Sequence, residues 1–512
     1  MNIMRRRGVE FAGCVVMVLM LAGCTSSEQF YEDVSLSRET AYRQWENRKE
    51  RQETSQPHIS GQLSVEDCLK LALANNKGLQ RVLEEKQIAR GEELKSYSAI
   101  LPTVGLTGNY QRLDMVSSIS LPFGSGKITM GDVDNYTAGL RVTQPIYAGG
   151  SIIARLHAGR LFSLLTDQTV RSAVQDLTYA ASHAYYDVLL NQHLLEISAD
   201  AVRSAQAHLE SVKQKRQGGV ASDFDVLRAE VELSNFQAEL IRNKNTINVA
   251  KANLLKVMGV SQDSDVTLSD GLAYALLKVP MEEAVETAYR NRPDLFGREF
   301  NIKYQKELLK VVQSRYWPII SGYYDKTWSK PDPHNRMLIE WGRAWDVGVM
   351  ATLPIFDGFA REGEVVQQKA RLKQARIDLI DAEETTLFEL TKAQLSIEDA
   401  EEFVDSQRLN LTRAQEGLRL AEVGYKEGTN TQVEMIDAQA ALTTARANYY
   451  QAIYLHIIAK LDLQKAMGTL MTFEVPASET GTKNYELQPA EGGFDQAGFQ
   501  PAGETVSAGS VK

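Results

Sequence analysis

The sequence predicts a mixed α+β membrane protein with an internal duplication, in which each copy carries a pair of β-strands and a very long helical hairpin. The stretch from Pro145 to Met258 matches a second stretch 209 residues later without a gap, so that Val257-Met258-Gly259 falls on Ala466-Met467-Gly468. Each copy contains segments that alternate between apolar and polar residues, followed by a long stretch that lacks proline. Such self-similarity indicates that one structural unit has been duplicated.

The N-terminus, residues 1–23, is predicted to be a cleaved targeting segment. A basic stretch, Arg5 to Arg7, precedes an apolar stretch from Phe11 to Leu21, and small residues then lead to Cys24. This order resembles a bacterial lipoprotein signal, in which the cysteine receives a covalent lipid and becomes the first residue of the mature chain. A plain membrane anchor is the alternative, but the apolar stretch is too short to span a bilayer. In some bacteria, an Asp directly after the lipidated cysteine keeps such lipoproteins at the inner membrane. Thr25 occupies that position here, which favours the outer membrane.

The next part, residues 24–61, is polar and charged, and we expect a lipidated tether with one short helix. A helix then begins at Ser64, whose hydroxyl can cap it together with Asp67, and it runs to about Tyr97. Cys68 lies on the apolar stripe of this helix and is predicted to pack as a small hydrophobic residue. With Cys24 acylated, it has no disulfide partner.

The first strand pair, 103–145, has one apolar and one polar face. The apolar face comprises Val104, Leu106, Gly108, Tyr110, Tyr136, Ala138, Leu140 and Val142, and Arg141 lies on the polar face. In the second pair, 319–354, the return strand repeats this phase, whereas the first strand alternates poorly because Asp325 and Lys326 are adjacent near its end. This pattern is typical of membrane β-barrels, but a soluble sandwich shows it too.

Aromatic residues favour the membrane alternative. Four of the five tryptophans lie in or beside the second strand pair, and such rings prefer the two interfaces of a bilayer. Four strands cannot close a barrel, and open sheet edges are not tolerated in lipid. A spanning chain must therefore oligomerise, and three copies would supply a twelve-stranded barrel.

The long helices follow the strand pairs. No proline interrupts the chain between Pro145 and Pro280 or between Pro354 and Pro476. The segment from Gly150 to about Gln217 would form one helix roughly 100 Å long. Turns follow at Gly218-Gly219-Val220 and at Glu427-Gly428-Thr429, where Ser222 and Thr431 are placed to cap the returning helices.

The returning helix of the second copy has a strict coiled-coil stripe, comprising Met435, Ala438, Leu442, Ala445, Tyr449, Ala452, His456, Ala459, Leu463 and Ala466. The first copy repeats it from Val226 to Val257, and a second, less regular stripe lies beside it. Two adjacent stripes indicate a helix that packs against neighbours on two sides, as in the wall of a cylinder. A solid helical bundle would also give wide apolar faces.

Together these features resemble the TolC-type outer membrane efflux proteins, or outer membrane factors, in their lipoprotein branch. The resemblance covers about residues 61 to 470 and includes the Pro-Ile-aromatic junctions between strand and helix and the glycine-containing tips. It implies a homotrimer with a twelve-stranded outer membrane barrel and an α-helical coiled-coil tunnel through the periplasm. Members of the family serve as exit ducts for inner-membrane pumps, docked through a periplasmic adaptor protein that contacts the helical tips, here Gly219, Val220, Gly428 and Thr429.

The resemblance also implies a tunnel gate. In family members, carboxylates on the returning helix narrow the tunnel end, and the matching positions here are Glu434 and Asp437. Three copies would then form a negative ring, with a cation site at Asp437 and a barrier that depends on pH. Thr431 and Glu434 also match a capping box, so Glu434 has two interpretations at this stage.

Two further gate positions follow from the same resemblance. In some members a tyrosine before the tip glycine holds the closed state through the neighbouring hairpin; Tyr425 matches it, with Asp225 as the acceptor. Asn430 stands where some relatives carry an arginine clasp, so the closed state here would use different bonds. Because the second tip carries Glu434 and Asp437, we expect the second hairpin to be the one that moves.

Other functions find little support in the sequence. The formal net charge is −10 and there is no basic block, which argues against nucleic acid as a partner. The seven histidines lack paired-ligand spacing, and Gly124-Ser125-Gly126-Lys127 is not a complete phosphate-binding loop. We expect no enzyme activity, and no metal or cofactor beyond the lipid on Cys24. The competing class is a non-conducting lipoprotein, a coiled-coil spacer across the periplasm.

The predicted domains are a signal peptide (1–23), a tether (24–61), a first repeat (62–259) with its hairpin at 150–258, an equatorial linker (260–279), a second repeat (280–468) with its hairpin at 359–467, an equatorial segment (469–483) and a disordered tail (484–512).

Overall fold

The computed structural model describes residues 27–50, 57–120 and 127–470. The predicted signal peptide, Cys24, the loop at 121–126 and the tail lie outside these residues. No helix in the described ranges is long and apolar enough to cross a bilayer.

The described residues between the predicted lipidation site and the first repeat contain one helix, α2 (Ser27–Glu50), of 24 residues. The prediction of a short helix was therefore wrong in length. The next helix also differs from the prediction, because the segment expected to run unbroken to about Tyr97 is divided into α3 (Val65–Asn75) and α4 (Lys77–Tyr97). Asn76 causes the break: its backbone is extended, and its side chain accepts a hydrogen bond from the Leu79 amide to start α4.

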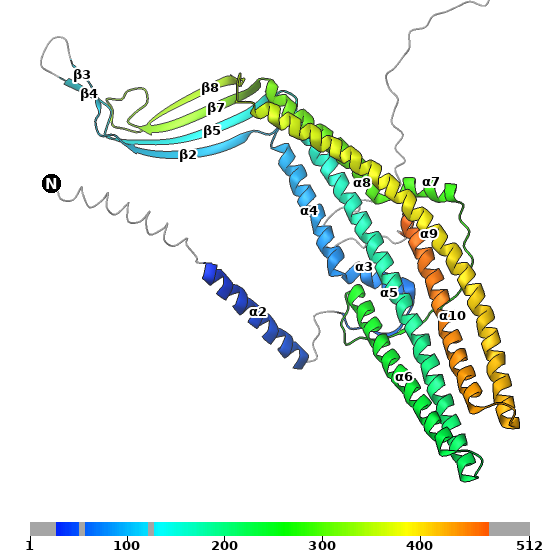
Figure 1. Cartoon of the computed structure of the whole chain (residues 1–512). Helices are drawn as coiled ribbons and strands as arrows, with labels where there is room; N and C mark the ends of the chain where they lie inside the picture. Colours follow the sequence, from blue (N-terminus) through cyan, green and yellow to red (C-terminus); the bar gives the residue numbers. More distant parts are fainter. Residues whose placement is uncertain (1–26, 51–56, 121–126, 471–512) are drawn as a thin grey trace, which may run out of the picture. The chain divides into compact units, whose positions relative to one another are not determined.

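The two predicted strand pairs form one antiparallel sheet of four strands in the order β2-β5-β7-β8 (Figure 1). The strands are β2 (Thr103–Arg112), β5 (Asp134–Ala148), β7 (Ile319–Lys330) and β8 (Gly342–Thr352). The pair from the first half meets the pair from the second half along β5 and β7. All four strands connect to helices at the same end of the sheet. At the other end, a small hairpin of β3 (Ser117–Ser120) and β4 (Lys127–Met130), which the sequence did not reveal, extends the first pair.

The register of the sheet explains why β7 alternates poorly. Asp325 lies opposite Arg141 of β5 and Asp346 of β8, so it belongs to the polar face. Lys326, the next residue, lies opposite Leu140 and Trp345 on the apolar face. One charged residue is therefore paired on the polar face, while the other interrupts the apolar face.

The long helices follow the predicted bounds closely. The first hairpin consists of α5 (Ser151–Gln217, 67 residues) and α6 (Asp223–Met258, 36 residues). The second consists of α9 (Ala360–Glu427, 68 residues) and α10 (Gln432–Ala466, 35 residues). Each returning helix is about half as long as its partner. The two hairpins are joined through packing of α10 on α5.

The remaining length of α5 and α9 is covered by helices that precede the strands. These are α4 in the first half, and α7 (Met281–Asn291) and α8 (Pro293–Gln313) with the short η1 (Ser314–Tyr316) in the second. α4 and α8 pack on α5, and α8 also packs on α9 (Figure 1). The predicted coiled-coil stripe is mostly buried along α10, from Leu442 to Ala466.

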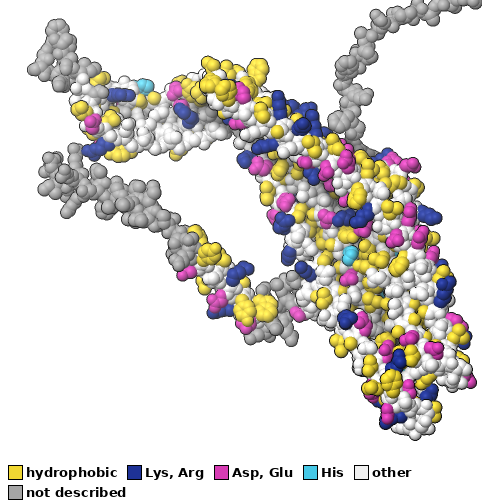
Figure 2. Space-filling model, viewed as in Figure 1, with side chains coloured by type: hydrophobic (Ala, Val, Ile, Leu, Met, Phe, Trp, Pro, Cys, Tyr) yellow, Lys and Arg dark blue, Asp and Glu magenta, His cyan; other side chains and the backbone are white. Residues whose placement is uncertain are grey.

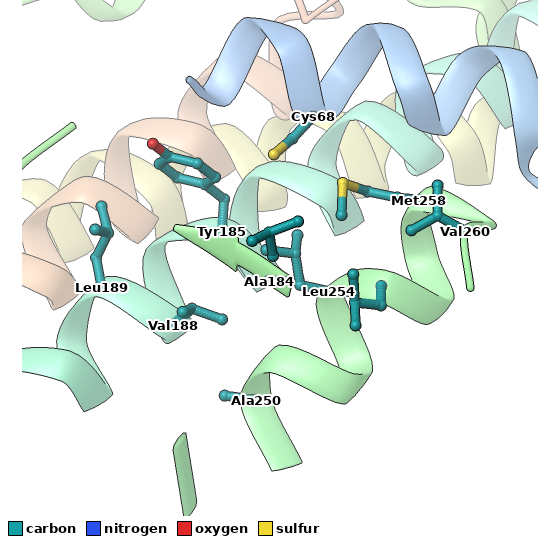
Figure 3. Close-up of a cluster of buried hydrophobic side chains, with 11 residues drawn as sticks. Cys68, Ala184, Tyr185, Val188, Leu189, Ala250, Leu254, Met258 and Val260 are labelled. Atoms are coloured by element: carbon teal, nitrogen blue, oxygen red, sulfur yellow. The ribbon is translucent and has the colours of Figure 1, made fainter. Parts of the chain in front are cut away.

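One core cluster joins α3, α5 and α6 (Figure 3). Cys68, Tyr185, Leu254 and Met258 lie in it and are fully or almost fully excluded from solvent. Burial raises the pKa of the Cys68 thiol to about 12, so the thiol stays protonated and packs as a small hydrophobic group, as predicted.

The predicted equatorial linker, 260–279, contains a strand that the sequence did not reveal. β6 (Asp265–Leu268) pairs in parallel with β1 (Ser60–Leu63) at the end of the tether. The Tyr185 hydroxyl of α5 donates a hydrogen bond to the Asp270 carboxylate (2.8 Å), and its oxygen lies 3.2 Å from the Leu63 carbonyl oxygen. The tether is thus fixed to the helical part next to the first core cluster.

A glycine with a positive φ follows the returning helix of each hairpin, α6 or α10. Gly259 has a φ of 70°, and a Cβ atom there would lie 2.5 Å from the Asn75 carbonyl oxygen. Gly468 has a φ of 74°, and a Cβ atom there would lie 2.9 Å from the Arg292 amide nitrogen. Each glycine therefore permits close contact with a break between two helices, at Asn76 or at Arg292.

Candidate functional site at the hairpin ends

The turn of the first hairpin is built by glycine and closed by a capping box. Gly219 has a φ of 77°, and Val220 beside it is 81% exposed. The Asp225 carboxylate accepts hydrogen bonds from the Ser222 amide (2.9 Å) and hydroxyl (2.7 Å). These bonds lower the pKa of Asp225. Asp225, predicted as an acceptor for Tyr425, therefore holds the start of α6.

The turn of the second hairpin likewise contains a glycine with a positive φ and a capping box. Gly428 has a φ of 75°, and the Thr429 amide donates to the Gly424 carbonyl (2.8 Å). The Thr431 amide donates to the Glu434 carboxylate (2.7 Å), which completes a capping box. Of the two interpretations of Glu434, the capping role is therefore present in the structure. Asn430, at the predicted clasp position, lies against Gly424, where a Cβ atom would be 2.6 Å from its side chain.

Asp437 lies one turn beyond Glu434 on the same side of α10 and is exposed. It forms no hydrogen bond or ion pair within the described part of the chain. Its charge is thus available to solvent or to another copy, which is compatible with the predicted carboxylate ring.

Tyr425 contacts α5 rather than Asp225. Its ring meets the His208 ring edge-on with centroids 5.7 Å apart, and the Lys215 ammonium lies 3.7 Å from its centroid. No hydrogen bond joins Tyr425 and Asp225 among the residues that the structure describes. Within one chain, Tyr425 of α9 contacts α5 of the other hairpin through an aromatic and a cation–π contact.

A residue that the sequence analysis missed also joins the hairpins. Gln432, the first residue of α10, is 8% exposed, and its side-chain amide donates to the Asp225 carbonyl (3.0 Å). Farther from the tips, the Ser204 hydroxyl donates to the Gln439 side-chain carbonyl (3.2 Å), and Arg446 lies 3.6 Å from Asp200. The sequence pattern could place Gln432 at the start of a helix. The partner of its side chain, however, depends on how the two hairpins pack.

The contacts of Tyr425 and of Ser204 with Gln439 border a cavity of about 370 Å³ to which all four hairpin helices contribute. The titratable side chains that line it are His208 and Lys215 of α5, Glu232 of α6, and Glu422, Tyr425 and Lys426 of α9; α10 adds Met435, Ile436 and Gln439. The His208 Nε2 atom is buried and has no partner in the described ranges. Burial, and then the charge of Lys215, lower the pKa of His208.

Metal ligation finds no support in the described residues, where no group of three or more His, Cys, Asp or Glu side chains could hold an ion. His456 is completely buried, its Nε2 lies 3.8 Å from a Glu401 oxygen, and its ring meets the Tyr274 ring with centroids 4.8 Å apart. It is part of the packing between α9, α10 and the linker.

Comparison with known proteins places this architecture in one family. The family model described as "Outer membrane efflux protein" matches residues 68–260 and 284–469. The outer membrane protein TolC of Vibrio cholerae is 22% identical over 416 residues, which cover 80% of this chain and 92% of that protein. The alkaline protease secretion protein AprF of Pseudomonas aeruginosa is 21% identical, with 80% of this chain and 85% of that protein covered.

Solved structures show the same fold. The Campylobacter jejuni CmeC outer membrane channel aligns with a TM-score of 0.70 at 16% identity, over 81% of this chain and 87% of that one. The outer membrane protein VceC from Vibrio cholerae aligns with a TM-score of 0.67 at 15% identity, over 79% of this chain and 96% of that one. The two matched segments of the family model contain the sheet and both hairpins, and the chain belongs to the outer membrane efflux protein family.

Proposed function

We propose that this protein is the exit duct of an efflux or type I secretion system, and that it passively conducts substrates across the outer membrane of a Gram-negative bacterium. The observation that carries the proposal is the four-stranded sheet. Its outer strands, β2 and β8, each have one unpaired edge among the described residues, and one of its faces is apolar and exposed. Such edges are incompatible with lipid unless another copy pairs with them.

The proposed assembly is a homotrimer whose twelve strands close into one barrel. Because all four strands meet the helices at one end, a closed barrel would continue directly into a ring of six hairpins. The equivalent glycines and helix breaks of the two halves support descent from one duplicated unit. The hairpins would form a coiled-coil tunnel in the periplasm.

A lipid on Cys24 would hold the chain at the outer membrane after removal of residues 1–23. This part of the proposal rests on the sequence pattern, namely the basic residues, the apolar stretch and the small residues before Cys24.

The hairpin ends would serve as gate and docking surface. Asp437 of three copies would form the negative ring at the tunnel end, with Glu434 beside it and with Tyr425 and Asp225 in the contacts between hairpins. An adaptor protein would contact the tips at Gly219, Val220, Gly428 and Thr429, and would connect the duct to an inner-membrane pump. The names of relatives such as AprF and the efflux protein BepC support both secretion and efflux as the process served.

Conductance of the purified, folded protein in planar lipid bilayers tests the proposal. We expect stable channels whose unit is a trimer. A folded trimer that forms no channel, even when the gate variant Asp437→Ala is used, would favour the competing function of a non-conducting coiled-coil spacer. We assign no catalytic step to the chain.

A further inference from the structure

The apolar face of the sheet contains a group of basic side chains that neither the barrel nor the duct requires. Lys326 and Lys330 of β7 and Arg343 of β8 share this face, and we call them the outward basic patch. None of the three pairs with a carboxylate in the described part of the chain. The inference below rests on the proposed barrel, in which this face meets lipid.

Neighbouring side chains show that this face is otherwise suited to lipid. Val104, Leu106, Val347 and Val349 lie on it and are 66 to 78% exposed in the single chain. Figure 2 shows hydrophobic side chains gathered where the sheet joins the long helices. A charged residue on such a surface is costly near the middle of a bilayer and much less so near an interface.

Aromatic rings mark the position of that interface at the end of the sheet away from the helices. Tyr110 and Tyr136 lie opposite each other with ring centroids 5.0 Å apart, and Trp341 lies 6.3 Å from Tyr136. Tyrosine and tryptophan prefer the boundary between hydrocarbon and head groups. Because the helices lie at the opposite end, this boundary belongs to the outer leaflet.

The outward basic patch lies at this boundary. Lys330 is paired with Tyr136, and Arg343 is paired with Trp328, one step nearer the membrane centre on the same face. Lys326 lies one step deeper, yet its ammonium is 5.1 Å from the centroid of the Trp328 ring. Its side chain is therefore directed toward the boundary, as expected for a lysine that places its charge among head groups.

Charge on this face is unbalanced. Among the strand residues that share the face, Asp134 is the carboxylate, and it already accepts a hydrogen bond from the Tyr110 hydroxyl (3.0 Å) and lies 3.7 Å from Arg112. Three cations remain on two adjacent strands, with the ring of Trp328 between Lys326 and Lys330. Clusters of this kind at a membrane boundary bind anionic lipid head groups.

We propose that the outward basic patch is a binding site for the phosphate groups of the phosphorylated glycolipid that forms the outer leaflet of the outer membrane. Arg343 would bind a phosphate through two donors, while Lys326 and Lys330 would contribute point charges on either side. The exposed apolar residues nearer the helices would contact the acyl chains of the same molecule.

The test compares binding of a bis-phosphorylated lipid A to the purified trimer with binding of the same glycolipid after enzymatic removal of its phosphates. The variant carries Lys326→Gln, Lys330→Gln and Arg343→Gln. A matched control carries Lys244→Gln, Lys373→Gln and Arg376→Gln on the helices, which changes the net charge equally. We expect wild type and control to bind the phosphorylated form about tenfold or more tightly than the variant does, and all three to bind the dephosphorylated form alike.

Equal affinity of wild type and variant for the phosphorylated form would overturn the site. Full competition by inorganic phosphate at the same concentration as the glycolipid would overturn the lipid as the ligand, because it would make the patch a general anion site. Channel conductance keeps this test separate from the proposed duct. The variant should conduct as wild type does, since its residues face outward, whereas a wild type without channels would contradict the duct whatever lipid it binds.

Discussion

Arg141 and Asp325 lie directly opposite each other on β5 and β7, and the guanidinium donates two hydrogen bonds to the carboxylate, from Nε to Oδ1 (2.6 Å) and from Nη2 to Oδ2 (2.7 Å). Asp346 of β8 lies opposite Asp325 on the same polar face. Each chain therefore has one cation and two carboxylates at this level of the sheet. In the proposed trimer, the row would carry a net negative charge on the inner wall of the barrel.

We expect Asp346→Asn to reduce the preference of the channel for cations. The change removes the carboxylate that Arg141 does not neutralise, so the permeability ratio of K⁺ to Cl⁻ should fall. Reversal potentials in a KCl gradient measure it. Asp134→Asn is the matched control, because Asp134 lies on the outward face and its loss should leave the ratio unchanged. An equal effect of both variants would show that the row does not line the pore.

Asp437→Ala should raise conductance and weaken block by divalent cations. Asp437 is exposed and unpaired in the described chain, so three copies at a narrow tunnel end would repel one another and attract cations. Single-channel recording with and without millimolar Mg²⁺ measures both effects. Asp399→Ala, which removes an exposed carboxylate from the middle of α9, should change neither. Unchanged block in Asp437→Ala would remove this residue from the gate.

Gln432→Glu should loosen the contact between the two hairpin tips. The substitution replaces the amide that donates to the Asp225 carbonyl with a carboxylate, which places two acceptors against each other. We expect more frequent channel opening and faster proteolysis near the tips. Gln439→Glu adds the same charge to the same helix but keeps the acceptor that Ser204 uses, so it should behave as wild type. An equal increase in opening frequency in both variants would show that the added negative charge, and not the lost hydrogen bond to Asp225, causes the effect.

Acid should weaken the contact between the hairpins around His208. Its pKa is lowered in the folded protein, so the stabilisation is complete above the ordinary value of about 6.5 and decreases as the pH falls below that value. A protonated His208 would also add a positive charge beside Lys215 and Lys426, opposed by Glu232 and Glu422.

The measurement for His208 is the opening probability between about pH 7.5 and 5, a range in which histidine is the side chain that usually titrates. We expect openings to increase with acid in wild type and to depend less on pH in His208→Gln. His334→Gln, an exposed substitution in the loop between β7 and β8, serves as the control. Retention of the full pH dependence in His208→Gln would show that His208 does not cause it.

Gly259→Ala should destabilise the helical part by about 1 to 3 kcal/mol, since the new methyl group would occupy space next to the Asn75 carbonyl and the backbone has a positive φ. A lower thermal midpoint by circular dichroism would report it. Gly363→Ala in α9 meets no atom within 4 Å and should instead stabilise the protein slightly. An unchanged thermal midpoint for Gly259→Ala would mean that the backbone at Asn75 and Asn76 can shift to accommodate the new methyl group.

The long helices were predictable because their signals are local. Proline-free stretches set their lengths, and tip glycines with Ser222 and Thr431 set their ends, so the predicted bounds agree with α5, α6, α9 and α10 within a few residues. The strand pairs were also evident from alternation. The break at Asn76 was not predictable, since the helical pattern continues on both sides; Asn76 caps the start of α4, and Gly259 packs closely against this break.

Side-chain partners in the site were less predictable. Tyr425 faces His208 and Lys215 rather than Asp225, because the hairpins pack through α5 and α10. The apolar stripe of a single helix does not specify which other helix it packs against. The pairing of β1 with β6 was not predictable for a related reason. β1 is short and polar, and its partner lies about 200 residues away in the chain.

The pairing of β1 with β6 also gives the tether a mechanical role. The lipid proposed on Cys24 fixes one end of the tether at the membrane surface, while β1 fixes the other end against α5 through Leu63 and Tyr185. Between them, the 24 residues of α2 would span about 36 Å as a helix, and a helix resists both stretching and compression better than a coil does. Because the strands already join the helical part to the proposed barrel, the tether would be a second connection between the membrane and the helices, and it would limit how far α5 near β1 can move away from the membrane surface.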